Sequence, residues 1–432
     1  MKVALFTLGC KVNQYETQSL REELIRRGFE IALENQTAFD VAVVNSCTVT
    51  AESDRKTRQL VHRLRRNNPT GIIVLTGCMV QASPRTNGDF AGADIVVGNT
   101  DIKKIADLIE KFIAERKQIT EICPHTENER FNTPNITDFA ERTRAYMKIE
   151  DGCNRYCSYC IIPFARGFVR SKPLNEIKKE AEDLASRGFI EIVLVGINLS
   201  AYGKDECFNL CDAVDTVSKV EGIKRVRLGS LEPDHISDEM LKRFKENEKF
   251  CPQFHLSLQS GCDETLKRMN RHYDTAFYAD LIKRIRKMFD NAAITTDIMV
   301  GFAGETEEEF NKSVAFLKEI GFSKAHVFAY SRRGGTVAYG MKGQVTNAEK
   351  SRRSKLMSSA AAECEKNFLA SHIGKTLPVL FETSDGKKCE GYTDNYLRVL
   401  VETEKNLKNQ TANVKIIKAY DEYCVGEISV PY

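Results

Sequence analysis

The chain has 432 residues, of which 42% are hydrophobic and 28% are charged, a composition typical of a soluble globular protein with two or three domains. Its net charge of +3 is too small to indicate nucleic-acid binding by itself, so any RNA-binding surface must be local. No apolar run approaches the roughly 18 residues that cross a bilayer, and neither a lipidation motif nor a signal peptide is visible. These absences exclude contact with a membrane and predict a cytoplasmic protein.

Residues 1–120 alternate short apolar runs with helical stretches. The runs are rich in β-branched residues and lie at residues 3–8, 41–44, 72–76 and 95–98, with helices expected at 13–27 and 53–66. Continuous apolar runs of this kind are typical of strands buried on both faces of a parallel sheet. We therefore predict a small doubly wound α/β domain over residues 1–120.

Three cysteines in this segment share one topological position. Cys10, Cys47 and Cys78 each follow the end of a predicted strand within three residues, and each directly follows a glycine or a serine. Parallel sheets gather functional groups at the carboxyl ends of their strands, so the three thiols are expected to meet in one crevice. Small preceding residues would let the backbone approach a bulky inorganic group. Three unrelated buried cysteines are the alternative, but the shared position favours an iron–sulfur cluster site.

Residues 121–143 are polar and contain proline, asparagine and threonine, which predicts a linker. A longer strand and helix alternation follows over residues 144–370. Strands are expected at residues 145–149, 191–195, 225–228, 253–258, 294–300 and 324–330, and helices at 175–187, 275–289 and 307–320. Six such units with right-handed crossovers predict a partial (β/α)6 barrel.

Residues 371–432 have a different character. Short strands separated by glycine, aspartate and asparagine turns are expected at residues 379–382, 390–392, 397–401, 411–417 and 423–428. The complete fold class is therefore α/β, with an N-terminal doubly wound domain, a central partial barrel and a small C-terminal β-barrel.

A second group of three cysteines lies in the loop after the first barrel strand. Cys153, Cys157 and Cys160 have the spacing C-x3-C-x2-C, and the next cysteine along the chain is Cys207. A four-iron cluster takes one thiolate per iron, so three ligands leave one iron open. A structural zinc site would need four ligands in paired clusters, and an odd number of cysteines in a reducing compartment argues against disulfides. The loop is predicted to lie at the carboxyl-end mouth of the barrel, where such folds keep their chemistry.

The C-x3-C-x2-C motif resembles the radical S-adenosylmethionine (SAM) superfamily, in which the amino and carboxylate groups of SAM bind the open iron. Essentially the whole chain resembles the radical SAM methylthiotransferases. The resemblance lies in both cysteine groups, in the order of the modules and in residues 8–17, 230–233 and 256–261. Residues 11–17, Lys-Val-Asn-Gln-Tyr-Glu-Thr, are most similar to the branch that modifies N6-threonylcarbamoyladenosine (t6A) in tRNA. The C-terminal module is similar to a TRAM domain, which grips tRNA in relatives.

This resemblance implies two 4Fe–4S clusters with different tasks. Cys153, Cys157 and Cys160 would hold the cluster that cleaves SAM, and Cys10, Cys47 and Cys78 an auxiliary cluster that carries the sulfur to be donated. One SAM would supply the methyl group, and a second a 5′-deoxyadenosyl radical that takes the hydrogen from C2 of t6A at position 37. The implied partners are the tRNA anticodon loop, a low-potential electron donor such as flavodoxin or ferredoxin, and a sulfur source.

Seven further positions match those that lie near SAM in the superfamily: Tyr159, Gly196, Asn198, Ser257, Gln259, Asp297 and Gly301. The tyrosine stands at the aromatic position beside the adenine. The next two follow the second barrel strand, where the methionine amino group is received, although the acidic residue usual there is absent. The others belong to the ribose-contacting region and to a glycine-rich loop, residues 297–305. At each position, packing or capping at the barrel mouth is the alternative.

Basic and aromatic side chains that could contact RNA occur in three places. They are residues 55–58 with 63–66, residues 331–333, and a group in the C-terminal module that comprises Lys387, Lys388, Tyr392, Tyr396 and Arg398. Unstacked bases suit such surfaces, although a solvated helix face is the commoner explanation of a basic run.

Three other functions remain open from the sequence. The same clusters could serve methylthiolation of isopentenyladenosine in tRNA or of a ribosomal protein side chain, or the chain could be a non-catalytic iron–sulfur electron carrier or sensor. The remaining eight cysteines are expected to be packing or surface thiols, with Cys207 and Cys211 spaced like a pair on a helix.

Overall fold

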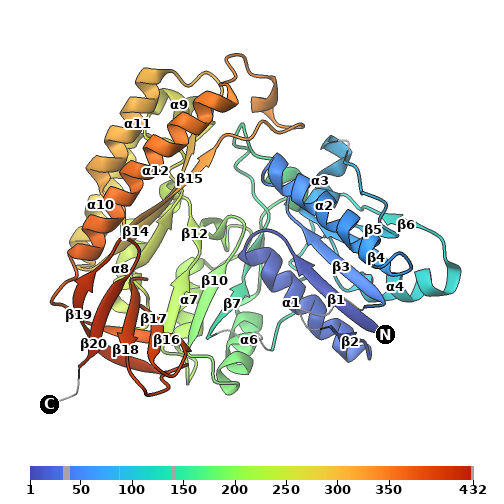
Figure 1. The fold of residues 1–432 in the computed structure, drawn as a ribbon, viewed down its shortest axis with the longest axis horizontal. Helices are drawn as coiled ribbons and strands as arrows, with labels where there is room; N and C mark the ends of the chain where they lie inside the picture. Colours follow the sequence, from blue (N-terminus) through green and yellow to red (C-terminus); the bar gives the residue numbers. More distant parts are fainter. Residues whose placement is uncertain (33–38, 87, 138–142, 430–432) are drawn as a thin grey trace.

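The structure is a computed structural model that describes all residues except 33–38, 87, 138–142 and 430–432. An N-terminal parallel sheet, a central open barrel and a C-terminal closed β-barrel follow one another along the chain (Figure 1). The sheet and the C-terminal barrel lie on different sides of the central barrel. None of the described helices is both long and apolar enough to cross a bilayer.

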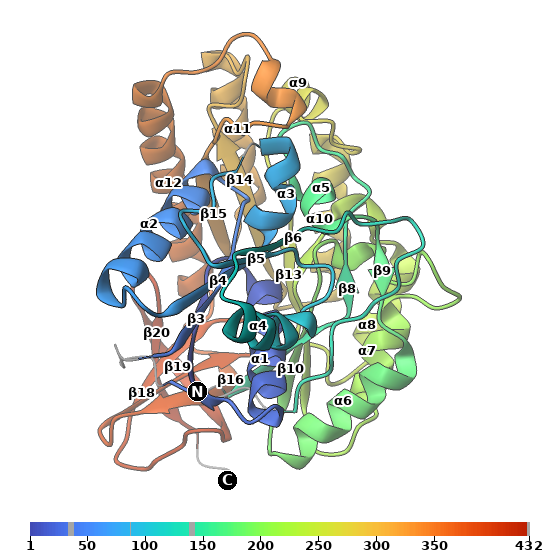
Figure 2. The same ribbon diagram turned by 90° about the vertical axis from the view of Figure 1, so that its right-hand side faces the viewer.

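The N-terminal sheet has the strand order β2-β1-β3-β4-β5-β6, and all of its pairs are parallel. Its strands are β1 (Lys2–Thr7), β2 (Glu30–Ile31), β3 (Val41–Ser46), β4 (Ile72–Gly77), β5 (Ile95–Val97) and β6 (Ile119–Glu121). Helices α1 (Lys11–Arg26), α2 (Ala51–Asn67), α3 (Cys78–Thr86) and α4 (Lys104–Glu115) cover it. The helices lie beside the strands in Figure 2, and apolar clusters fill both faces of the sheet, as expected of a doubly wound sheet. The prediction is confirmed, except that the two short edge strands β2 and β6 were not expected.

The central barrel consists of six parallel strands in two sheets, β11-β10-β7 and β12-β13-β14-β15. The strands are β7 (Arg144–Lys148), β10 (Glu191–Val195), β11 (Arg225–Leu228) with its continuation β12 (Ser230–Leu231), β13 (Gln253–Leu256), β14 (Ala293–Val300) and β15 (Lys324–Ala329). The partial barrel is confirmed. The fourth strand ends two residues earlier than predicted, so Ser257 and Gln259 lie in the loop beyond it.

Helices pack around the outside of the barrel: α6 (Leu174–Ser186), α7 (Leu210–Ser218), α8 (Asp238–Glu246), α10 (Thr275–Met288), α11 (Glu307–Ile320) and α12 (Asn347–Ala370). Helix α11 shows why such bounds are readable from sequence. The backbone N–H of Glu309 donates to the Thr306 hydroxyl, and the Glu309 carboxylate accepts from the Thr306 N–H, which forms a capping box. Gly321, with φ of 62°, ends the helix in the left-handed region.

The C-terminal barrel is closed in the order β16-β17-β18-β20-β19. Its strands are β16 (Thr376–Ser384), β17 (Lys388–Thr393), β18 (Arg398–Glu402), β19 (Thr411–Ala419) and β20 (Cys424–Ile428), each at a predicted place. Arg225, the first residue of β11, donates to the carbonyls of Pro378 and Tyr392. The small barrel therefore packs against the end of the central barrel where the strands begin.

Candidate active site

The structure brings the loops of Cys10, Cys47 and Cys78 together. Cys10 precedes α1, Cys47 directly follows β3, and Cys78 opens α3 directly after β4. Strands β1, β3 and β4 are neighbours in the sheet, so these loops emerge side by side. A Cβ built on Gly9 would lie 2.9 Å from the Cβ of Cys47, which shows how closely the first two loops approach.

Asn13 ties two of these loops together. Its amide nitrogen donates to the carbonyl oxygen of Ser46 at 3.0 Å and of Leu8 at 3.2 Å, and its amide oxygen accepts from the Cys10 thiol at 3.3 Å. The third loop is joined through Ser46, whose hydroxyl accepts the backbone N–H of Met79 at 3.2 Å. The three cysteines are thus held by buried hydrogen bonds and not by packing alone.

The loop that carries Cys153, Cys157 and Cys160 is equally fixed. The Cys153 N–H donates to the Gly167 carbonyl, and the Cys160 N–H to that of Cys157, both at 2.9 Å. A Cβ at Gly152, whose φ is +88°, would lie 1.8 Å from a backbone carbonyl oxygen, so the turn into this loop requires glycine.

In each group at least one thiol, Cys78 in the first and Cys153 in the second, has an environment that disfavours the free thiolate. Burial raises the pKa of Cys78 to about 12, with smaller contributions from Cys47 and Cys10. Burial also raises the pKa of Cys153 to about 12, and Cys157 adds to the rise. Because iron binds the thiolate, cluster binding must release protons from these groups.

The thiol groups are not arranged for one metal ion. Within the described part of the chain, no three His, Cys, Asp or Glu side chains lie close enough to hold a single ion. A four-iron cluster places each thiolate on a different iron and therefore keeps the sulfurs further apart. One group offers three thiols on three adjacent loops and the other offers three thiols on a single loop, so the residues present fit such a cluster.

Two arginines, which the sequence analysis did not single out, contact one cysteine of each group. Arg166, on the short helix α5 (Ile162–Arg166) after Cys160, donates from Nε to the Cys78 sulfur at 3.1 Å. Arg271 donates from Nη1 to the Cys157 sulfur at 3.3 Å. No motif in the sequence indicates that either side chain would turn toward a thiol.

Three of the predicted SAM-contacting residues come together on the barrel. Half-buried Tyr159 packs edge-on against Phe302, with ring centres 6.3 Å apart, which places it beside the glycine-rich loop that contains Gly301. Within that loop the Gly301 N–H donates to Glu305 at 2.6 Å. Asp297 is held at the base of the same loop, where its carbonyl accepts the Gln259 N–H at 2.9 Å.

The fourth barrel strand leads into a second fixed loop. The Ser257 carbonyl accepts from both Arg271 and Tyr273, and its hydroxyl lies 3.1 Å from that of Ser230. Since Arg271 also contacts Cys157, this loop is joined to the cysteine loop. Gln259, with φ of 68°, adopts a left-handed conformation that few non-glycine residues take.

The acid that the sequence seemed to lack beside Gly196 is Glu150, from strand β8 (Glu150–Asp151). Its carboxylate accepts the Asn198 N–H at 2.7 Å, and a Cβ on Gly196 would lie 2.5 Å from the same oxygen. The other carboxylate oxygen of Glu150 and the side-chain oxygen of Asn198 are buried without a hydrogen-bond partner. Burial raises the pKa of Glu150 well above its usual value. Two unsatisfied acceptors at one point fit an ammonium group such as that of SAM.

One cavity, of about 620 Å³, connects three parts of the chain. It is lined by Cys10 and Lys11 from the N-terminal domain, by Gly196 and inward-facing residues of all the barrel strands, and by Tyr392 and Tyr396 of the C-terminal barrel. Successive side chains in a strand point to opposite faces, so positions that face the cavity alternate with positions that face the core. On β7, for example, Arg144 and Tyr146 face the cavity.

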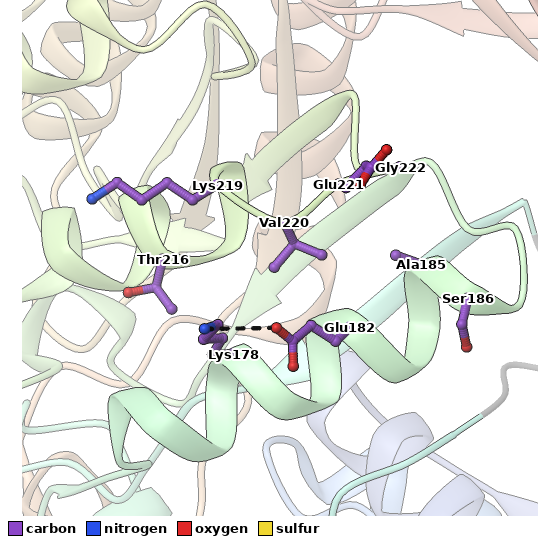
Figure 3. Close-up of a pocket in the computed structure, with 9 residues that line it drawn as sticks. All are labelled: Lys178, Glu182, Ala185, Ser186, Thr216, Lys219, Val220, Glu221 and Gly222. Carbon is purple, nitrogen blue, oxygen red and sulfur yellow. Dashed lines mark ion pairs between the residues drawn. The ribbon is translucent and has the colours of Figure 1, made fainter.

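A second hollow, of about 700 Å³, lies on the outer helices α6 and α7 (Figure 3). It is lined by nine residues, among which the figure marks an exposed ion pair between Lys178 and Glu182 at 3.7 Å. This hollow contains neither cysteine nor aromatic residues, and its residues precede β10 and β11, away from the carboxyl ends of these strands. The smaller cavity inside the barrel is therefore the candidate active site.

The comparisons with known proteins agree with this geometry. A family model described as "Radical SAM superfamily" matches residues 147–317, and one described as "Uncharacterized protein family UPF0004" matches residues 2–98. The threonylcarbamoyladenosine tRNA methylthiotransferase MtaB of Bacillus subtilis (strain 168) is 38% identical over 98% of this chain and 96% of its own length.

The chain belongs to the radical SAM methylthiotransferase family.

This methylthiotransferase also resembles other members closely. A tRNA-2-methylthio-N(6)-dimethylallyladenosine synthase of Clostridium perfringens (strain SM101 / Type A) is 33% identical over 98% of this chain and 96% of its own length. The fold is similar to that of the radical SAM methyltransferase TsrM from Kitasatospora setae, solved with cobalamin and a 4Fe–4S cluster bound, at a TM-score of 0.57 and 14% identity over 78% of this chain and 73% of that one. Membership makes the chain a radical SAM enzyme that transfers a sulfur-containing group, with SAM and an iron–sulfur cluster as cofactors.

Some side chains of the methylthiotransferase lie elsewhere than the sequence indicated. Arg333 is not available to RNA, because it is buried and pairs with Asp54 of α2. Cys207 and Cys211 do not form a pair on one helix, because α7 begins at Leu210. All 14 cysteines are free thiols, and of the eight outside the two groups Cys123 and Cys207 are exposed and the others buried.

The predicted RNA-binding group of the C-terminal module is divided in the structure. Tyr392, Tyr396 and Arg398 line the cavity, whereas Lys387 and Lys388 do not. The two tyrosine rings stack with centres 4.8 Å apart. This part of the module therefore faces the active site.

Proposed function

We propose that the chain is a tRNA methylthiotransferase that places a methylthio group on C2 of t6A at position 37. The supporting relatives are the four named threonylcarbamoyladenosine tRNA methylthiotransferase, at 32–38% identity over at least 91% of this chain. The similarity of residues 11–17 to that branch points the same way.

In this proposal each cysteine group binds one 4Fe–4S cluster. Cys153, Cys157 and Cys160 hold the cluster beside SAM, and Cys10, Cys47 and Cys78 hold the auxiliary cluster. The clusters and SAM together supply the radical that removes hydrogen from an unactivated aromatic carbon and the sulfur that replaces it. The four parts of the chain are placed at residues 1–120, 121–143, 144–370 and 371–432, with the last part acting as the TRAM-like module.

The protein's own residues bind and orient the reactants. Glu150 and Asn198 receive the ammonium group of SAM with their unpaired oxygens, and Tyr159 packs beside its adenine. The loops of Ser257, Gln259 and the 297–305 segment form the remaining wall. Buried hydrogen bonds fix all of these loops, which keeps the site organised and excludes water while a reactive radical is present.

The observation that carries the proposal is the shared cavity. One space is lined by Cys10 of the proposed auxiliary cluster, by Gly196 of the proposed SAM site and by Tyr396 of the C-terminal module. A base flipped out of a single-stranded anticodon loop could reach both cofactors there, at a cost of a few kcal/mol at most. A carrier of electrons alone would have no need of such a space.

Reconstituted enzyme tests the substrate directly. The anaerobic holoenzyme, given SAM, a sulfur source and a low-potential donor such as flavodoxin or ferredoxin, should convert anticodon stem-loop RNA carrying t6A to the 2-methylthio nucleoside, as measured by mass spectrometry of the digested RNA. RNA carrying isopentenyladenosine and the ribosomal protein substrate of related enzymes serve as alternatives. Product from either of these, with none from t6A, would overturn the assignment.

The non-catalytic alternative has its own test. An electron carrier or sensor would be reduced without consuming SAM, whereas the proposed enzyme releases 5′-deoxyadenosine under strong reductant. Iron and sulfide analysis should give about eight irons per chain, falling to about four when either cysteine group is replaced by alanine. A wild-type content of about four irons would remove the second cluster from the proposal.

A further inference from the structure

The cavity beside Cys10 contains more positive charge than its carboxylates balance. Arg144 of β7 and Arg227 of β11 line it, Arg225 lies two residues before Arg227 on β11, and the carboxylates paired with these three arginines are Glu191 and Glu382. Lys11 adds a fourth cation from the N-terminal domain, and it lines the same cavity as Arg144 and Arg227. Four cations thus share two carboxylates.

Lys11 is the cation without an anionic partner. Within the described residues its ammonium group makes no ion pair, and its closest described partner is the Tyr146 ring, whose centre lies 5.6 Å from Nζ. The two carboxylates that line the cavity belong to other cations. Glu365 pairs with Lys324 at 3.1 Å, and Glu422 acts on Arg398. An uncompensated cation among like charges in a concave space stabilises a bound anion.

The surroundings of Lys11 add to this preference. It is the first residue of α1, a helix whose N-cap Cys10 makes no side-chain capping bond and whose first turn holds no acidic residue. The positive end of the helix macrodipole is therefore left for whatever occupies the cavity. Opposite, the guanidinium groups of Arg144 and Arg227 are held over the Tyr396 ring at 4.9 and 4.8 Å from its centre.

We propose that Lys11 binds the carboxylate of the N6-substituent of the target adenosine. The inference rests on the proposed function, because a threonylcarbamoyl group carries a carboxylate and an isopentenyl group carries none. A base whose C2 approaches the sulfur carried by the auxiliary cluster, beside Cys10, has its N6 substituent within the same cavity. Lys11 follows Cys10 along the chain and lines that cavity. Lys11 would thus select the anionic substituent and hold it, as a specificity residue and not as a participant in the radical chemistry.

The pairing is tested by removing the negative charge from the RNA substituent and, separately, the positive charge from Lys11. The holoenzyme is given anticodon stem-loop RNA with t6A, or the same RNA in which the threonine carboxylate is a carboxamide. We expect wild type to bind the carboxylate form about tenfold more tightly, as a charge-assisted hydrogen bond implies. Lys11→Met should bind the two forms equally, whereas Lys11→Arg should keep most of the preference.

Lys324→Met is the matched control, because Lys324 lines the same cavity but is already paired. It should retain the preference for the carboxylate. Iron content of Lys11→Met equal to wild type would show that the neighbouring Cys10 still binds its cluster. The inference is overturned if Lys11→Met keeps the wild-type preference, or if wild type modifies t6A without distinguishing the carboxamide. Failure of wild type to modify t6A at all would instead overturn the proposed function.

Discussion

The guanidinium group of Arg166 lies 3.1 Å from the sulfur of Cys78, although the two residues belong to different cysteine loops. Arg166 follows Cys160 on the barrel, and Cys78 opens a helix of the N-terminal sheet. Arg166 is fully buried and pairs with Glu16 of α1 as well. One side chain therefore connects the two proposed cluster sites and brings a positive charge to one of them.

We expect Arg166→Met to lower the reduction potential of the auxiliary cluster by about 60 mV or more. For a one-electron couple this shift corresponds to a tenfold change in the equilibrium constant. The reduced cluster carries more negative charge and loses both a cation and an N–H donor. Lys148, which pairs with Glu16 at 2.8 Å, keeps that carboxylate compensated in the variant. The measurement is a redox titration followed by electron paramagnetic resonance, in protein whose other cysteine group is replaced by alanine.

Arg271→Met provides the reciprocal test, since Arg271 contacts Cys157 of the other group. It should shift the potential of the SAM-cleaving cluster and leave the auxiliary cluster unchanged. Equal shifts of both clusters in either variant would contradict the assignment of one arginine to each.

The two cysteine groups should be separable by function. Cys157→Ala is expected to abolish release of 5′-deoxyadenosine, because it removes a ligand of the cluster beside SAM. Cys47→Ala should still cleave SAM while losing methylthiolation of the RNA. Chromatographic assay of 5′-deoxyadenosine, with nucleoside analysis of the same reactions, distinguishes them, and equal loss of both products in both variants would refute the division of tasks.

Replacement of Glu150 should weaken SAM binding. In Glu150→Gln the oxygen that lies beside Asn198 is kept, but the negative charge that would pair with the SAM ammonium is lost, which should raise the dissociation constant about tenfold or more. Calorimetry with the cluster-loaded protein measures this. S-adenosyl-4-(methylthio)butyrate, which keeps the sulfonium of SAM but lacks the amino group, should bind wild type and variant alike. A variant defect that persists with this compound would indicate a merely structural role.

We predict that the exposed basic face of α2 contacts the RNA. Lys56, Arg63 and Arg66 line a shallow hollow of about 590 Å³. The double variant Arg63→Ala, Arg66→Ala should weaken binding of anticodon stem-loop RNA. It should also reduce the slope of log affinity against log salt by about 1.4 to 1.8, the change expected when two phosphate contacts are lost. Arg55, on the same helix but paired with Glu52, is the control. An unchanged salt slope in the double variant would exclude this face.

Stability should depend on pH through Glu191. Burial alone would raise its pKa, but Arg227 and neighbouring arginines outweigh burial and lower it. A lowered folded-state pKa contributes stability above the ordinary value near 4.3 that is lost as pH falls through the folded-state pKa. Glu191→Gln should therefore cost about 3 kcal/mol in the free energy of unfolding at pH 7, and less below about pH 4.

Urea unfolding of cluster-free protein at several pH values measures that dependence. The control is Glu182→Gln, because Glu182 is exposed and its pair with Lys178 is of the kind that contributes about 0.5 kcal/mol or less (Figure 3). A pH-independent difference between wild type and Glu191→Gln would show that charge is not the cause.

The strands and long helices were predictable because their patterns are local. Helix α11 matches its predicted bounds, since Thr306, Glu309 and Gly321 mark its ends within the sequence itself. The convergence of Cys10, Cys47 and Cys78 followed from a rule of topology that needs only the strand ends. Short edge strands such as β6 were missed, because three residues with one apolar side chain carry no periodic signal.

The partners of individual polar side chains were not predictable, because they lie far apart in the sequence. Glu150 meets Asn198 across two barrel strands, and Arg333 meets Asp54 across the boundary between the barrel and the N-terminal sheet. Sequence alone shows Arg333 as part of an exposed basic run. The fold shows that Arg333 instead forms an ion pair with a buried carboxylate.

The Arg333–Asp54 and Arg166–Glu16 ion pairs have a consequence for biogenesis. Each places one charge in the N-terminal sheet and its counter-charge in the barrel, and all four side chains are buried. Separating the two bodies would break both ion pairs and expose to water the four side chains that now pack between them. The sheet and the barrel should consequently fold and melt as one cooperative unit, and neither cysteine group should mature when its half of the chain is produced alone.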